Sequence, residues 1–153
     1  MFNFFQKKSV DFFSQEEKKI ITSAIEAAER STSGEVRVFI ESKCLFVNAV
    51  DRAIEMFQQL NMTNTAQRNA VLVYVAVKDR QLAVFVDEGI HQKVGNEFWN
   101  ASVKEMLLHF NKENHAQGIA EVVKQIGEAL KQHFPYDGAT DVNELPDDIV
   151  FGK

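Results

Sequence analysis

The chain has few residues that crosslink a fold or interrupt it: one cysteine, two prolines and seven glycines among 153 residues. Because Cys44 is alone, no intrachain disulfide can form, which agrees with a reducing compartment. No run approaches the roughly 20 apolar residues of a membrane span. Residues 1–8 lack the long apolar stretch and cleavage site of a secretory signal. We therefore expect a cytoplasmic protein without a transmembrane segment, with Cys44 as a partly buried thiol.

The negative charge of the chain is concentrated at one end. The formal net charge is -5, and residues 137–153 hold five acidic residues against a single lysine. Residues 1–136 are nearly neutral and show no basic stripe with interleaved aromatics, so the pattern of a nucleic-acid binder is absent. We expect one domain over residues 1–136, with residues 1–13 docked on it and residues 137–153 as a loosely docked acidic tail. We also expect a monomer.

Two apolar runs joined by a polar turn lie at the centre of the sequence. Residues 71–77 are apolar and mostly β-branched or aromatic, which predicts a strand covered on both faces. Residues 78–80 form the turn, and residues 82–86 form a second, antiparallel strand. Asn69 and Asp87 should therefore lie together at the end opposite the turn, which we call the open end of the hairpin.

Helical patterns surround this hairpin. A capping box at Ser14 begins a first helix that ends near residues 31–34, and alternating residues 35–41 predict a strand. Apolar spacing predicts further helices over residues 50–60, from an Asn96 cap to residue 110, and over residues 119–134, with a loop at residues 88–95. Strand, helix and strand form a crossover unit. The pattern predicts a three-layer α/β/α sandwich: a small mixed β-sheet covered by helices on both faces.

Short motifs along the chain resemble the TPM domain family, and its soluble bacterial branch most closely. They are residues 13–17 (FSQEE), 32–38 (TSGEVRV), 68–72 (RNAVL), 78–80 (KDR), 87–90 (DEGI), 118–119 (GI) and the ending 143–149 (NELPDDI). The resemblance implies an α/β sandwich with a mixed central sheet. It also implies phosphatase activity, reported for photosystem-repair relatives, and binding of divalent cations, chiefly calcium.

The sequence departs from the family at three places. Ala70 and Asp87 stand where the family often has glycine, and residues 94–96 (VGN) stand where it often has Leu-Thr-Asp. Asn96 keeps the capping role there, but its amide brings no charge to a metal. Many relatives carry a signal peptide and a membrane anchor, and we expect neither in this chain.

The residues themselves suggest an oxygen-ligand site at the open end. Asp87 and Glu88 are adjacent carboxylates, Asn96 adds an amide oxygen, and Glu35 reaches the same end if its strand runs parallel to residues 71–77. Carboxylate and amide oxygens suit calcium or another divalent cation. Arg68 and Asn69 are candidate binding residues beside them. The alternative is that Asp87 pairs with Arg68 across the hairpin end while Glu88 faces water.

Two functions of different classes follow. The first is a binding or scaffold module with a low-affinity divalent-cation site, no organic cofactor and a protein partner. The second is a metal-dependent phosphatase acting on phosphomonoesters, with Asp87 and Glu88 on the ion and Arg68 facing the phosphate. The motifs of known phosphatases are absent: Cys44 has no arginine six residues on, there is no Asp-x-Asp, and the histidines lack a paired metal spacing. The binding module is therefore preferred.

Overall fold

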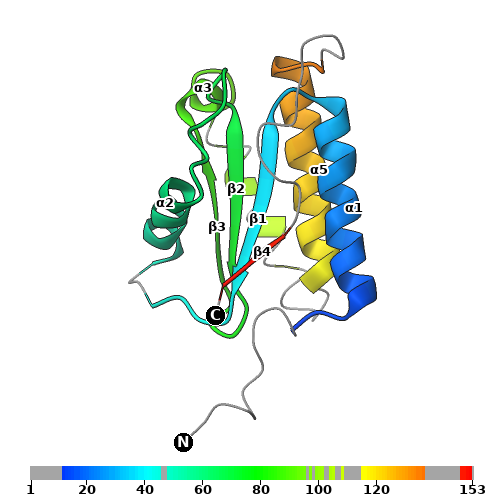
Figure 1. Cartoon of the computed structure of the whole chain (residues 1–153), viewed down its shortest axis with the longest axis vertical. Helices are drawn as coiled ribbons and strands as arrows, with labels where there is room; N and C mark the ends of the chain where they lie inside the picture. Colours follow the sequence, from blue (N-terminus) through cyan, green and yellow to red (C-terminus); the bar gives the residue numbers. More distant parts are fainter. Residues whose placement is uncertain are drawn as a thin grey trace, which may run out of the picture.

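The computed structural model describes residues 12–45, 48–95, 97, 99–101, 104–105, 108, 115–136 and 149–152. Residues 97, 99–101, 104–105 and 108 are helical. The other elements are labelled in Figure 1 and are α1 (Gln15–Ser31), β1 (Glu35–Glu41), α2 (Ala49–Gln59), β2 (Ala70–Ala76), β3 (Gln81–Val86), α3 (Glu88–His91), α5 (His115–His133) and β4 (Val150–Phe151).

The four strands form one mixed sheet in the order β3-β2-β1-β4. β1 runs parallel to β2 and to β4, whereas β2 and β3 form an antiparallel hairpin. The chain passes from β1 to β2 through α2, because parallel neighbours need a crossover connection. The predicted hairpin and mixed sheet are therefore confirmed.

Each face of the sheet carries its own apolar core. Val71, Val73 and Val75 pack with residues of α1 and α5 on one face. Leu72 and Tyr74 pack with residues of α2 on the other. Figure 1 shows α2 on one side of the sheet and the α1–α5 pair on the opposite side. Helices thus cover both faces, as predicted, and β2 needs a continuous apolar run because neither of its faces meets water.

The long helices begin and pack as their sequences indicate. Ser14 Oγ accepts from the Glu17 backbone N–H at 3.1 Å, and Glu17 Oε1 accepts from the Ser14 N–H at 2.8 Å, which is the predicted capping box. α1 lies against α5, and a Cβ at Gly127 would stand 2.8 Å from the Ala28 Cβ. Glycine at position 127 therefore allows α5 to pack closely against Ala28 of α1.

Local predictions around α2 and α3 need correction. The loop expected at residues 88–95 contains the four-residue helix α3, because the Asp87 side chain accepts from the Glu88 N–H and caps it. Val50, one of the apolar residues whose spacing predicts α2, is exposed, because Ala49 rather than Val50 occupies the buried face in the first turn of that helix. The predicted cap at Asn96 lies outside the described residues.

One chain end agrees with expectation over its described residues, and the other differs. Phe13 is buried and the Phe12 ring stacks on His115 at 5.4 Å, so residues 12 and 13 are docked, while residues 1–11 lie outside the described residues. Within the acidic tail, Val150 and Phe151 form the strand β4 beside β1. We expected a loosely docked tail without a strand. The apolar content of residues 149–151, which packs on both cores, accounts for this strand. Residues 137–148 and 153 lie outside the described residues.

Candidate functional site

The open end of the hairpin gathers most of the predicted site residues. Since β1 and β2 are parallel, Glu35 pairs in register with Ala70 and arrives beside Asn69, whose carbonyl accepts from the Glu35 N–H at 3.2 Å. Asp87 joins them because its N–H donates to the Ala70 carbonyl at 3.0 Å. Glu35, Asn69 and Asp87 are all buried. The prediction that these residues meet at one end of the sheet is confirmed.

Arg68 holds the acidic groups of the open end. Its Nε and Nη2 donate to the two carboxylate oxygens of Asp87 at 2.6 and 2.8 Å, and its Nη1 donates to Glu88 at 3.2 Å. The hydrogen bonds to Asp87 raise the pKa of Arg68 above its ordinary value. Asp87 is 6% exposed, Arg68 40% and Glu88 66%. The alternative prediction, in which Arg68 pairs with Asp87, is therefore present, and Arg68 also contacts the exposed Glu88.

The backbone of the open end is strained and tightly packed. Arg68 has a φ of 51°, in the left-handed region that non-glycine residues seldom adopt. The Gly89 N–H donates to the Arg68 carbonyl at 3.0 Å. A Cβ at Gly89 would lie 2.2 Å from the Gln67 carbonyl oxygen and 2.7 Å from that of Arg68. Glycine lets the start of α3 close on residues 67–68, which brings Asp87 to Arg68.

The described residues do not form a ready cation site. Calcium takes six to eight oxygen ligands, whereas both oxygens of Asp87 already accept from Arg68. Among the described ranges, no group of three or more His, Cys, Asp or Glu side chains lies close enough to hold a metal. Asn96 falls outside these ranges. The side chain of Asn69 is buried, and neither its amide nitrogen nor its oxygen has a hydrogen-bond partner there.

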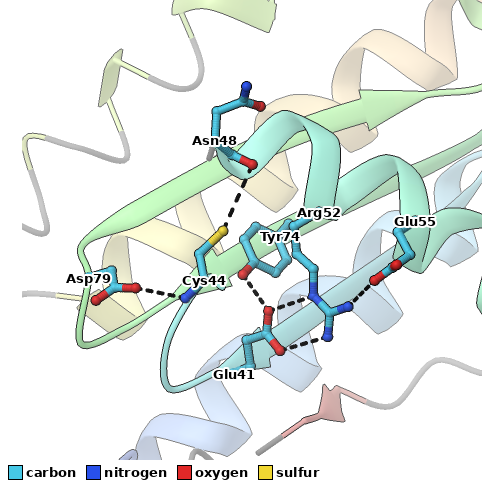
Figure 2. A network of polar contacts seen from close by, with 7 residues as sticks. All are labelled: Glu41, Cys44, Asn48, Arg52, Glu55, Tyr74 and Asp79. Atoms are coloured by element: carbon cyan, nitrogen blue, oxygen red, sulfur yellow. Dashed lines mark hydrogen bonds and ion pairs between the residues drawn. The ribbon is translucent and has the colours of Figure 1, made fainter. Parts of the chain in front are cut away.

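A second polar cluster lies at the other end of the sheet, where β1 and β2 finish (Figure 2). Glu41, the last residue of β1, accepts from Arg52 Nε and Nη2 at 2.8 and 2.9 Å. The Tyr74 hydroxyl donates to the same carboxylate at 2.5 Å. Arg52 also pairs with Glu55 on the outer side of α2. The contacts of Arg52 with Glu41 therefore link α2 to the strands of the sheet that it covers.

Cys44 lies at the edge of this second cluster. Its N–H donates to an oxygen of Asp79 at 2.8 Å, and its thiol points to the Asn48 carbonyl at 3.8 Å. Cys44 is buried, in line with the structural thiol expected from the sequence. Asp79, expected only as a turn residue, links the β2–β3 turn to the loop before α2.

Sequence reasoning missed the second cluster. Glu41 was assigned to a polar strand face, and Tyr74 to an apolar run. A signal was nonetheless available: Arg52 is charged and lies one residue before the buried Ala53 on the inner side of α2. A charge so placed needs a partner on the sheet, and Glu41 is the acidic residue at the end of β1, where the crossover leaves the sheet.

The stability of the chain is expected to fall above pH 10 because of Tyr74. Burial and the hydrogen bond to Glu41 raise the pKa of its hydroxyl far above the ordinary value near 10. The unfolded chain therefore loses this proton while the folded chain keeps it, which favours unfolding by about 1.4 kcal/mol per pH unit above 10. Urea unfolding between pH 9 and 11 should show a steeper loss for wild type than for Tyr74→Phe. Parallel pH profiles would contradict this assignment.

Comparison with known proteins places this geometry in a family. A family model of the TPM domain matches residues 7–129. The chain belongs to the TPM domain family. The resemblance read from the sequence motifs is thus confirmed over most of the chain.

Three solved structures share the fold of this TPM domain. The BA42 protein of the psychrophilic bacterium Bizionia argentinensis is 38% identical, with 92% of this chain and 96% of that chain covered and a TM-score of 0.84. The N-terminal domain of the cg2496 protein from Corynebacterium glutamicum is 14% identical, with 85% and 84% covered and a TM-score of 0.64. The N-terminal domain of a P. gingivalis protein is 16% identical, with 82% of each chain covered and a TM-score of 0.67. The last two, at such low identity, are alike in fold alone.

No curated protein matches the sequence. In the part of the chain that the structure describes, no helix has the length and apolar character needed to cross a membrane.

Proposed function

We propose that this TPM domain is a non-catalytic binding module whose binding surface is the open end of the hairpin. One observation carries the proposal: Arg68 sits in a left-handed conformation with its guanidinium on Asp87 and Glu88, close to the surface. A left-handed backbone at a non-glycine residue costs roughly 1–3 kcal/mol. Arg80 adopts a similar φ in a turn, whereas at Arg68 the guanidinium meets two carboxylates near the surface. The exposed Glu88 and the half-exposed Arg68 offer a partner protein one charge of each sign.

A divalent cation, chiefly calcium, is proposed as a weak ligand of the same surface. The carboxylates of Asp87 and Glu88 have the right chemistry, but Arg68 already neutralises them. A cation and the guanidinium require the same two oxygens of Asp87, so they must compete. We therefore propose a millimolar affinity that is set by Arg68 as much as by the acidic residues.

A calcium titration followed by backbone NMR tests this competition. Wild type should show shifts over residues 87–95 only at millimolar calcium. Arg68→Ala should bind about tenfold more tightly, a difference of about 1.4 kcal/mol, because the competing cation is removed. Asp87→Asn should show no binding, since its neutral amide cannot replace the carboxylate.

Arg80→Ala provides a matched control for Arg68→Ala. Arg80 has nearly the same φ, 52°, but lies in the turn at the other end of the hairpin. Its removal should leave the calcium affinity unchanged. Equal affinity in wild type and Arg68→Ala, or the absence of shifts in all variants at millimolar calcium, would refute the competition.

The metal-dependent phosphatase remains the alternative prediction, and no contact at the open end favours it over binding. It required Arg68 to face a phosphate, whereas the Arg68 guanidinium is engaged by Asp87 and Glu88. Cys44 is buried at the other end of the sheet. A cytoplasmic location, a monomeric state and a protein partner are part of the proposal.

A further inference from the structure

The edge of β1 is covered by a very short strand from the end of the chain. Val150 and Phe151 pair in parallel with Phe39 and Ile40, and the Gly152 N–H donates to the Ile40 carbonyl at 2.8 Å. Figure 1 shows β4, in red, beside β1 near the C-terminus. Parallel pairing is slightly less stable per residue than antiparallel pairing. A two-residue parallel strand therefore adds little backbone pairing to the sheet.

The side chains of this segment enter both apolar cores. Ile149 and Phe151 pack on the core of α1 and α5, whereas Val150 packs on the core of α2. The Lys18 ammonium lies 5.5 Å from the centroid of the Phe151 ring. Residues 149–152 are nevertheless only half-buried. The edge of β1 is thus shaped to receive three successive apolar residues that point alternately to the two faces of the sheet.

The position after these three residues is tightly packed and favours glycine. A Cβ at Gly152 would lie 2.7 Å from Phe39 Cζ and 3.2 Å from Glu41 Cβ. Both are side chains of β1, and Glu41 is fixed by Arg52 and Tyr74. The edge therefore selects its occupant by sequence: apolar residues that alternate between two cores, followed by glycine.

We propose that the edge of β1 is a peptide-binding groove that the chain's own residues 149–152 fill in the free protein. Short elements with little buried surface open locally without unfolding the rest of a domain. When β4 leaves, an extended segment of another polypeptide with three apolar residues followed by glycine can add to the sheet in its place. This is recognition by strand addition, in which backbone hydrogen bonds give affinity and alternate side chains give specificity. The groove is distinct from the open end, which lies at the other end of the parallel strands.

A variant of the full chain makes the groove accessible to a probe. Gly152→Val should detach β4, because the added carbons collide with Phe39. The probe is a synthetic nonapeptide with the sequence of residues 145–153 (LPDDIVFGK). In Gly152→Val, the peptide should shift the backbone NMR signals of Phe39 and Ile40. It should also bind this variant at least tenfold more tightly than it binds wild type. The same peptide with valine for glycine should not bind either chain.

Gly95→Val is the matched control for the protein variant, because a Cβ at Gly95 meets nothing within 4 Å. This variant should bind the peptide no better than wild type. A folded Gly152→Val chain that fails to bind the peptide overturns the proposal. Equal binding to wild type also overturns it, since the peptide would then occupy another surface.

Hydrogen exchange of wild type tests the proposal without any substitution. If β4 opens locally, the Gly152 amide should exchange at least a hundredfold faster than the amides of β2. Exchange of Gly152 at the rate of the β2 amides would mean that β4 leaves only when the whole domain unfolds. That result overturns the proposal even if Gly152→Val fails to fold.

Discussion

Glu41→Ala is expected to destabilise the folded chain by about 3 kcal/mol. Removing one partner of a buried ion pair costs roughly 3–5 kcal/mol, since the other charge stays behind without compensation. Here the Glu41 side chain is 8% exposed and that of Arg52 20%, so water relieves part of the cost. The buried Tyr74 hydroxyl also loses its acceptor. Urea unfolding at pH 7 should show a lower midpoint with an unchanged slope.

Glu55→Ala is the matched control for this prediction. Glu55 pairs with the same Arg52 from the outer side of α2 and is 37% exposed. An exposed ion pair contributes at most about 1 kcal/mol. A similar loss of stability in both variants would mean that Glu41 is no more important than a surface partner. The assignment of Glu41 as the link between α2 and the sheet would then be wrong.

The centre of the fold could be predicted because its cause is local in the sequence. The apolar run of residues 71–77 indicates a strand buried on both faces, and the turn after it indicates an antiparallel partner. The parallel arrangement of β1 and β2 then follows from the helix between them. The parallel pairing of β1 and β2 alone brings Glu35 close to Asn69 and Asp87, although Glu35 is far from both in the chain.

The remaining features depend on contacts that no local pattern specifies. Whether Asp87 meets a cation or Arg68 depends on the left-handed turn of Arg68, and nothing in the sequence around an arginine indicates that conformation. The docking of Val150 and Phe151 depends on a free edge of β1 more than 100 residues earlier, and their acidic neighbours suggested a solvated tail. Buried polar clusters such as Glu41–Arg52–Tyr74 likewise combine residues that each have an ordinary explanation alone.

Gly89→Ala is expected to cost about 3 kcal/mol and to open the Arg68–Asp87 pair. The reason is steric, because a Cβ would lie 2.2 Å from the Gln67 carbonyl oxygen. That atom belongs to the backbone and cannot rotate away, so α3 must shift as a whole. Overpacking that moves backbone costs typically 1–3 kcal/mol, and the hydrogen bond from the Gly89 N–H to Arg68 would be lost as well.

Gly95→Ala separates this steric effect from the general effect of replacing a glycine near the open end. Gly95 follows α3 by four residues, and a Cβ there would meet no atom within 4 Å. Its unfolding midpoint in urea should match that of wild type or rise slightly, since alanine lowers the entropy of the unfolded chain. NMR should further show large shifts of the Arg68 side chain in Gly89→Ala only. If Gly89→Ala were as stable as Gly95→Ala, close packing of α3 on residues 67–68 could not be what brings Asp87 to Arg68.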